Sequence, residues 1–434
     1  MSTETRTRSW SIHGRPEITT RYEILGRVGS GSYADVYRAR RLSDGLVVAL
    51  KEIHDQQSAI REIEALRSLQ GAPNVIDMLE YFYDDEFEED AVVVLEFLPS
   101  DLEVVISDVK RRGGSITPGE AKRWMLQVLS GVNACHQAGV MHRDLKPSNL
   151  LISAEGVLKV ADFGQSRVLQ DLSFEGTTPY ETNSEKEKAS NQLTEADYLK
   201  ELEFIREKSK LEDNASCLAT CSTVDIDDDQ LGSYTEEPAG AFTSCVGTRW
   251  YRAPELLYGS CSYGPEVDLW SLGCILAEMV SLVPLFPGVS DIDQIAKIIT
   301  VLGNLNEQNF PGCSNLPDFN KISYSNVENP SGLEACLPNR PIEEVNIVKR
   351  LLCYDPANRV IASELLKDGY FIEEPLPVEI DQLIVPTRDE ADESSGGEWD
   401  EFRDVGSGPD DIDEFGSNLM GVTKTDKGFC ISFS

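Results

Sequence analysis

Four short segments of the chain carry residue types that act on phosphate groups. A Gly-Ser-Gly turn spans residues 29–31, and glycines let backbone N–H groups come close to phosphate oxygens. Lys51 stands in an apolar strand, where its ammonium group needs a partner. The runs His142–Asn149 (HRDLKPSN) and Asp162–Gly164 (DFG) add two aspartates, a lysine and an asparagine. Together these four segments point to one chemistry, that of phosphate groups.

Each segment alone has an ordinary structural interpretation. Many hairpins contain two glycines in a turn, and the amine of an edge-strand lysine reaches solvent. All four segments in one chain and in this order are not expected by chance, so we interpret them together.

The elements that must position these residues divide the chain into a strand-rich part and a helical part. Runs rich in β-branched residues predict strands over residues 21–29, 35–42, 47–53 and 91–98. Apolar residues at three-residue spacing predict a short helix over 58–69, and a capping box at Thr117 starts a helix to about Cys135. Val267–Met279 is apolar nearly all round and predicts a buried central helix. Two lobes of this kind would enclose a ligand cleft.

The four segments resemble those of a eukaryotic protein kinase, and His142–Asn149 is similar to the catalytic loop of the serine/threonine type. Later matches extend the resemblance over residues 22–371: Ala253–Glu255, Asp268–Gly273 and Asp355–Arg359. The resemblance implies an α+β, two-lobed protein kinase fold with a small β-rich N-lobe and a larger helical C-lobe. Every residue that the chemistry requires is present, which favours an active enzyme over a kinase fold that has lost its activity.

The resemblance implies ATP and Mg²⁺ as cofactors. Residues that match the family's nucleotide-binding positions are Val28, Gly29, Ser30, Gly31, Val36, Ala49, Lys51, Glu96, Leu98 and Leu151. Asn149 and Asp162 match the positions that hold two magnesium ions.

The resemblance also implies the catalytic roles. Asp144 would accept the proton of the substrate hydroxyl, and Lys146 would stabilise charge on the transferred phosphoryl group. Lys51 would hold the α- and β-phosphates while an ion pair with Glu62 keeps it in place. Positioning and charge neutralisation then do most of the work.

Several stretches are similar to the cyclin-dependent kinase branch, among them Ser58–Glu62 and Thr248–Glu255. Thr243 matches the position of that family's activating phosphothreonine. Three arginines match the set that would clamp its phosphate: Arg61, Arg143 and Arg167. An unmodified loop threonine is the alternative for Thr243. Ser32 and Tyr33 match the positions of the family's inhibitory phosphosites.

Three departures from that branch affect the interpretation. Ala34 replaces the third glycine of the phosphate-binding turn, where a positive φ would now be disfavoured. Only ten residues separate Lys51 from Glu62, so with Asp55 as helix cap we expect that cyclin docking is compromised and that no cyclin is required. The 88 residues between Gly164 and Ala253 contain an acidic insert at about 170–240, in which residues 193–211 are a helix candidate.

This combination resembles the plant cyclin-dependent kinase F type, whose members activate other cyclin-dependent kinases. The resemblance implies protein substrates, namely the activation-loop threonine of other cyclin-dependent kinases, and the RNA polymerase II C-terminal repeat as a further substrate. Two alternatives stay open. One is a proline-directed enzyme of the cyclin-dependent or mitogen-activated type with other substrates, and the other is a scaffold that acts through its acidic insert.

The charge of the chain is concentrated in two segments. The formal net charge is −36, of which residues 168–244 carry −12 and residues 387–434 carry −9. A chain this acidic is a poor candidate for binding nucleic acid or anionic membranes. We expect an N-terminal extension (1–21), a kinase domain (22–371) and an acidic, largely disordered tail (372–434). The sequence has neither a secretory signal nor a membrane-length apolar run, so we expect a soluble protein of the nucleus and cytoplasm.

Overall fold

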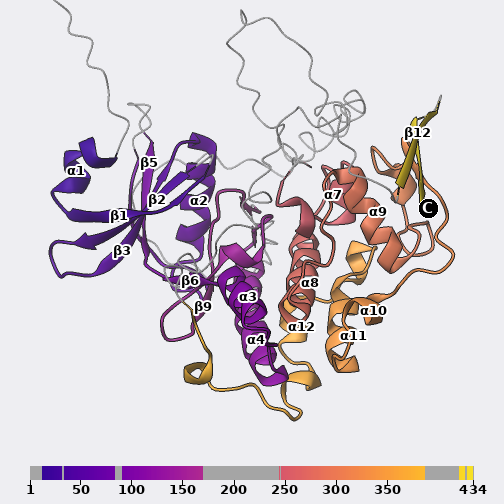
Figure 1. Cartoon of the computed structure of the whole chain (residues 1–434). Helices are drawn as coiled ribbons and strands as arrows, with labels where there is room; N and C mark the ends of the chain where they lie inside the picture. Colours follow the sequence, from indigo (N-terminus) through magenta and orange to yellow (C-terminus); the bar gives the residue numbers. More distant parts are fainter. Residues whose placement is uncertain are drawn as a thin grey trace, which may run out of the picture.

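The computed structural model describes residues 12–31, 34–83, 90–169, 244, 246–386, 420–425 and 428–433. A small lobe of strands and a larger lobe of helices lie side by side (Figure 1). The two-lobed α+β fold expected from the sequence is confirmed.

The N-lobe is built on one five-stranded antiparallel sheet in the order β1-β2-β3-β5-β4. Its strands are β1 (Tyr22–Ser30), β2 (Ala34–Arg41), β3 (Val47–Ile53), β4 (Met78–Phe82) and β5 (Ala91–Glu96). Successive residues of a strand point to opposite faces. In β3, Ala49 and Ile53 therefore pack in the main core, whereas Val48 and Leu50 pack in a second cluster on the outer face. The same alternation places Lys51 on the inner face.

Helix α2 (Gln56–Ser68) covers the inner face of this sheet (Figure 1). The side chain of Asp55 accepts a hydrogen bond from the backbone N–H of Ser58, so the expected cap is present. Only His54 and Asp55 separate β3 from α2, which leaves the helix little freedom relative to the strand. Glu62 is buried on the side of α2 that faces the cleft.

The C-lobe is organised around two long helices, α4 (Pro118–Gln137) and α8 (Glu266–Ser281). Thr117 and Glu120 form the expected capping box of α4, and α8 is buried along nearly its whole length. The remaining helices are α1 (Pro16–Thr19) in the N-lobe and α3 (Leu102–Arg111), α7 (Pro254–Leu257), α9 (Asp291–Leu302), α10 (Leu333–Cys336), α11 (Ile342–Leu351) and α12 (Ala362–Leu365).

Short strands and single 3₁₀ turns complete the lobes. The strands are β6 (Ser100–Asp101), β7 (Val140–Met141), β8 (Leu150–Ile152), β9 (Leu158–Val160), β10 (Arg167–Val168), β11 (Ile322–Tyr324), β12 (Met420–Thr425) and β13 (Gly428–Phe433). The 3₁₀ turns are η1 (Ile12–Gly14), η2 (Pro147–Asn149), η3 (Arg249–Tyr251), η4 (Cys313–Asn315), η5 (Pro356–Asn358), η6 (Gly369–Phe371) and η7 (Ile380–Gln382). Sheet β6-β8-β9 carries the catalytic segments between the lobes.

The structure extends the folded unit beyond both expected boundaries. On the N-terminal side, Ile12 and Ile18 are fully buried in the cluster on the outer face of the sheet. On the C-terminal side, residues 372–386 lie along α4, where Val378 N–H donates to the carbonyl of Gly119, and they end where the Ser100 hydroxyl donates to the carbonyl of Pro386. Single apolar residues in a polar context gave no periodic signal, which is why these segments were missed.

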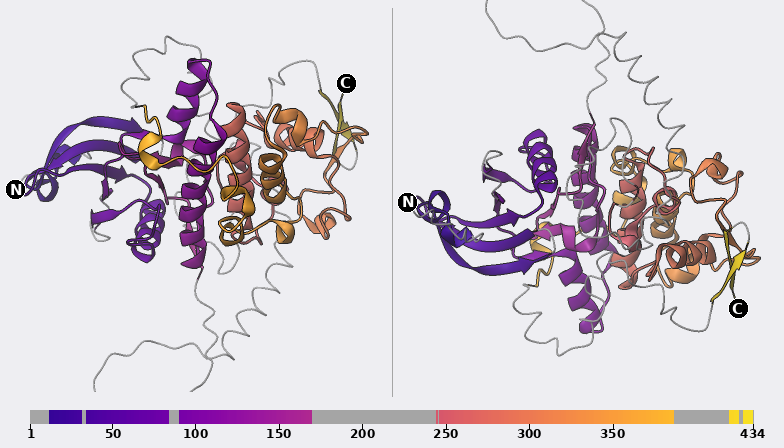
Figure 2. Two further views of the ribbon diagram at one scale, coloured as in Figure 1. Left: turned by 90° about the horizontal axis from the view of Figure 1, so that it is seen from below. Right: turned by 90° about the horizontal axis from the view of Figure 1, so that it is seen from above.

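Two short strands of the C-terminal segment are also described. Strand β13 pairs in parallel with β11 and antiparallel with β12, at the end of the C-lobe away from the N-lobe (Figure 2). Backbone pairing with a distant strand cannot be inferred from an acidic composition. Residues 170–243, which include most of the acidic insert and its helix candidate, lie outside the described residues. Within the described ranges, no helix is both long and apolar enough to cross a membrane.

Candidate active site

Three charged side chains from three elements meet in the cleft. Lys51 Nζ lies 2.7 Å and 2.9 Å from the two carboxylate oxygens of Glu62 and 2.7 Å from Oδ1 of Asp162. The partners are 11 and 111 residues away in sequence. Glu62 is 1% exposed, whereas the side chain of Asp162 is 46% exposed and borders the cleft.

The electrostatics of this triad favour a charged lysine and a charged aspartate. Burial alone would lower the pKa of Lys51, but the carboxylates of Asp162 and Glu62 outweigh burial and raise it. The ammonium group of Lys51 is also the main cause that lowers the pKa of Asp162 to about 2. Burial raises the pKa of Glu62 despite the neighbouring lysine. One cation shared by two carboxylates leaves a net negative cluster, which suits a divalent cation.

Asp144 is held from several directions at the floor of the cleft. Its Oδ1 accepts hydrogen bonds of 2.8 Å from both the N–H and the hydroxyl of Thr248. Its Oδ2 lies 3.4 Å from Lys146 Nζ, and the amide of Asn149 donates to its backbone carbonyl. A carboxylate fixed in this way can accept a proton from a hydroxyl placed above it.

The loop that carries Asp144 is anchored to α8 through Asp268. This buried carboxylate accepts hydrogen bonds from the backbone N–H groups of His142 and Arg143 and lies 2.9 Å from His136 Nε2. Burial opposes ionisation, but these donors outweigh it and lower the pKa of Asp268. The anchor fixes Arg143 in a left-handed conformation (φ 68°) directly before Asp144.

Further along, a buried ion pair secures the segment that follows the insert. Both guanidinium ends of Arg359 bind the carboxylate of Glu255 at 2.6 Å and 2.7 Å. The guanidinium carbon of Arg359 also lies 5.2 Å from the ring centre of Trp270. Removing either partner would leave an uncompensated buried charge.

The residues expected around the nucleotide base lie on the facing strands of the cleft. Ala49 on β3 and Leu95 on β5 are buried, and Val36 and Leu151 are half-buried. Val28 is 42% exposed at the mouth. Gly29, Ser30 and Gly31 lie in and after β1, and the N–H of Gly31 donates to the carbonyl of Ala34. Ala34 is not among the residues with positive φ, so its replacement of glycine causes no strain there.

The backbone segment of Glu96 and Leu98 joins the two lobes. The N–H of Glu96 donates to the carbonyl of Asp77, and its side chain pairs with Lys159. Sequence reasoning missed Lys159, which ties β9 to this connection. The sequence could have indicated this residue, because a lysine in an apolar strand, three residues before Asp162, requires an anionic partner.

The Asn149 and Asp162 pair fits a magnesium site of the kind completed by substrate. Within the described residues, no cluster of three or more His, Cys, Asp or Glu side chains is arranged to hold a metal. Magnesium usually takes one or two protein oxygens together with waters and substrate phosphates, which matches this donor set.

The three arginines of the expected clamp lie on neighbouring elements, while the threonine they would bind is outside the described residues. Arg143 is 3% exposed; it donates to the carbonyl of Gln165 and to the hydroxyl of Tyr263. Its Nη2 has no hydrogen-bond partner within the described residues. Arg61 lies on α2 and Arg167 on β10, and these two elements are in contact. Thr243, Ser32 and Tyr33 lie outside the described residues.

Sequence reasoning also missed the residues that join the catalytic loop to the segment after the insert. Gly247 has φ +79°, and its N–H binds the side chain of Gln165. A Cβ atom here would lie 2.5 Å from the carbonyl oxygen of Arg143, so only glycine fits. The next residue, Thr248, makes the contacts with Asp144. The feature of the sequence that could have indicated Thr248 is its position at the start of the segment Thr248–Glu255, which resembles the cyclin-dependent kinase branch.

Comparison with known proteins places this geometry in a family. The sequence matches the protein kinase domain over residues 22–204 and 228–371. The chain is a serine/threonine protein kinase of the cyclin-dependent kinase branch. It is 55% identical to cyclin-dependent kinase F-1 of Oryza sativa subsp. japonica and 50% identical to that of Arabidopsis thaliana, in each case over 98% of both chains.

More distant relatives show the same branch. Cyclin-dependent kinase 20 of Danio rerio is 34% identical over 85% of this kinase and 88% of the relative. Among solved structures, a chain of the CAK complex from Chaetomium thermophilum bound to ATP-gamma-S superposes with a TM-score of 0.61 at 28% identity. That match covers 85% of this kinase and 98% of the other chain.

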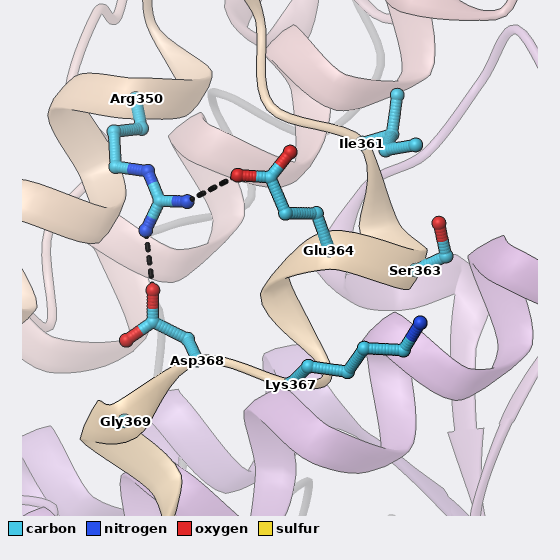
Figure 3. Close-up of a pocket in the computed structure, with 7 residues that line it drawn as sticks. All are labelled: Arg350, Ile361, Ser363, Glu364, Lys367, Asp368 and Gly369. Atoms are coloured by element: carbon cyan, nitrogen blue, oxygen red, sulfur yellow. Dashed lines mark hydrogen bonds and ion pairs between the residues drawn. The ribbon is translucent and has the colours of Figure 1, made fainter.

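A separate surface depression lies on the C-lobe, on other elements than the cleft (Figure 3). It is lined by Arg350, Ile361, Ser363, Glu364, Lys367, Asp368 and Gly369. Arg350 pairs with both Glu364 and Asp368, so its charge is already compensated. None of the residues that line this depression belongs to the cleft described above.

Proposed function

We propose that the kinase transfers the γ-phosphoryl group of ATP to the activation-loop threonine of other cyclin-dependent kinases. The observation that carries the transfer chemistry is the convergence of Lys51, Glu62 and Asp162 within hydrogen-bond distance, beside an Asp144 held by Thr248. Two similarities support this proposal: the near full-length match to relatives named cyclin-dependent kinase F-1, and the fold shared with a chain of a CAK complex bound to ATP-gamma-S.

In this proposal each residue has one task. The turn 29–31 and Lys51 bind the phosphates, and Glu62 keeps Lys51 in place. Asn149 and Asp162 would hold magnesium, which supplies charge neutralisation of the phosphates when bound. Asp144 accepts the hydroxyl proton, and Lys146 lies close enough to neutralise charge on the transferred group.

The base would lie between Val28, Val36, Ala49 and Leu151 and face the backbone of Glu96 and Leu98. We further propose that phosphorylated Thr243 is bound by Arg61, Arg143 and Arg167. The buried Nη2 of Arg143, which has no partner within the described residues, supports an anion at that position.

We infer that no cyclin is required. Since α2 begins three residues after β3 ends, the chain connection itself sets Glu62 opposite Lys51. In this arrangement the ion pair is a consequence of local chain length rather than of an added partner.

The decisive experiment incubates the pure full-length kinase, without a cyclin, with ATP, magnesium and a catalytically inactive cyclin-dependent kinase, and then maps the phosphosite. We expect phosphate on the activation-loop threonine. The D144N variant in the same assay is the matched control. Phosphorylation only after addition of a cyclin would contradict cyclin independence, and phosphate at other sites would contradict the substrate.

A specific observation favours a second candidate function, that of a proline-directed kinase. The carbonyl oxygen of Gly247, next to Thr248 and Asp144, accepts a hydrogen bond of 2.8 Å from Arg252 Nη2. Because this carbonyl already has a hydrogen-bond donor, it does not need the backbone N–H of the substrate residue that follows the phosphoacceptor. Proline lacks that N–H, so proline is favoured at this substrate position. The RNA polymerase II repeat remains a proposed substrate of this kind. Peptide pairs that differ only in Pro or Ala after the phosphoacceptor would distinguish the two functions.

A further inference from the structure

A row of charged side chains crosses the outer edge of the N-lobe beside the glycine-rich turn. Arg27 Nη1 on β1 lies 3.3 Å from Oδ1 of Asp35 on β2. Oδ2 of Asp35 lies 3.6 Å from Nε2 of His54, which directly follows β3. The other ring nitrogen of His54, Nδ1, lies 2.7 Å from Oδ2 of Asp90 at the start of β5. We call Arg27, Asp35, His54 and Asp90 the polar row.

His54 is the central member of the polar row, and carboxylates surround it. The side chains of Asp35 and Asp90 are 19% and 16% exposed, and Glu52 on β3 is 2% exposed. One carboxylate oxygen of Glu52 has no hydrogen-bond partner within the described residues. Three carboxylates this close repel one another, and a proton on His54 reduces this repulsion.

The other charged groups around the row come from every neighbouring element. Arg15, beside α1, donates to the backbone carbonyl of Asp90, and Arg27 lies on the far side of Asp35. Tyr37 on β2 interacts with Glu52 and carries no positive charge that could replace that of His54. Burial would lower the pKa of His54, but Asp90, Asp35 and Glu52 outweigh it and raise the pKa above its usual value.

The row can act on the turn because Asp35 is the second residue of β2, the strand that follows the turn. Asp35 pairs in register with Ser30 on β1 and with Glu52 on β3. Arg27 and His54 therefore bind Asp35 from the two sides of the strand that returns from the turn. Loss of positive charge on one side weakens the tie between the turn and β3, the strand that carries Lys51.

We propose that His54 is a positioning residue for nucleotide binding: in its protonated form it fixes the glycine-rich turn through Asp35, and in its neutral form it releases the turn. The proposal rests on the proposed function, in which ATP phosphates bind under this turn. Because the protonated form is present at low pH and is lost as pH rises, ATP binding weakens as pH rises through the pKa of His54.

The test measures the dissociation constant of a fluorescent ATP analogue, with magnesium, on the full-length kinase between pH 6 and pH 9. We expect binding to weaken about two- to fivefold across the transition, the range for partly exposed ion pairs. H54K keeps tight binding at every pH, and H54A shows weak binding throughout. D90N moves the transition to lower pH because it removes a carboxylate that favours the proton.

The matched control is E23Q, which removes the exposed Arg40–Glu23 pair on the same two strands and follows the wild type. In steady-state assays H54A raises the KM for ATP and leaves kcat unchanged, which a loss of stability alone does not produce. A wild type that binds no analogue overturns the proposed function. A wild type that binds with the same pH profile as H54A overturns the role of His54.

Discussion

Two ion-pair networks, one on the inner face of β3 and one beside its end, differ in burial. On the inner face, Lys51 is 12% exposed and pairs with Glu62, which is 1% exposed. At the outer edge, three residues later, His54 is 38% exposed and pairs with Asp35 and Asp90. Buried charges interact strongly and must all be paired, whereas exposed pairs are screened and contribute little. The difference in burial therefore predicts large effects for changes in the cleft and small effects for changes at the outer edge.

Replacing Asp144, the proposed catalytic base in the cleft, should have the largest effect on the reaction rate. D144N keeps the size of the side chain but cannot accept the substrate proton, and we expect a rate loss of roughly 10²–10⁴. Nucleotide binding should stay, because Lys51 and Asp162 are intact. Phosphate transfer and analogue titration on the same preparation measure both. An unchanged rate would remove Asp144 from the mechanism.

A substitution in the core on the outer face of the N-lobe sheet should lower the stability of the fold and leave the catalytic rate unchanged. Ile18 is fully buried against the sheet, so I18A should lower the free energy of unfolding by about 2–5 kcal/mol. Denaturant unfolding measures this loss, and kcat per folded molecule should stay. The matched control is I60A, at a position that is 38% exposed on α2. Equal losses in both variants would contradict the buried cap at the N-terminus.

Glu278 is a buried carboxylate whose pKa, unlike that of Asp162, is not brought below its usual value by its neighbours. Burial raises the pKa of Glu278 to about 7, and its hydrogen-bond donor is the hydroxyl of Tyr251. The folded state then binds more protons than the unfolded state between about pH 4.5 and 7, so stability falls as pH rises through that window. E278Q should remove up to about 3 kcal/mol of this dependence. Unfolding at pH 5 and pH 7.5 tests it; an identical slope in wild type and variant would contradict it.

The smallest effect concerns how Asp144 is held. T248V removes the hydroxyl that donates to the carboxylate of Asp144 but keeps the N–H, so we expect a fall in kcat of about 10–100-fold. T248S keeps the hydroxyl and should restore most of the rate. If the serine variant were as slow as the valine variant, packing of the methyl group rather than the hydrogen bond would position Asp144.

The cleft side of this comparison could be predicted from sequence to a large extent. The resemblance to the kinase family gave Lys51, Glu62, Asp144 and Asp162, and local capping rules gave Asp55 as the cap of α2. The outer side could not be predicted. His54, Asp35 and Asp90 belong to no motif, and they meet only because β2, β3 and β5 are neighbours in one sheet.

Other features of the fold could not be predicted from the sequence for the same reason. Residues 372–386 and the pairing of β13 with β11 depend on contacts with parts of the chain more than 90 residues away. Thr248 was matched to a motif, yet its contact with Asp144 spans 104 residues and had no local signal. The roles expected for Thr243, Ser32 and Tyr33 stay predictions.

From the sequence by itself, the resemblance of short motifs indicated the reaction class and the branch of the family. The local elements followed from periodicity and capping, which act over a few residues. Only the tertiary structure decided which further charges meet. Lys51, paired with Glu62 as expected, also binds Asp162, Arg143 has a buried Nη2 without a partner within the described residues, and His54 lies among three carboxylates. Coulomb interactions depend on distance in space and on burial, and the fold alone sets both.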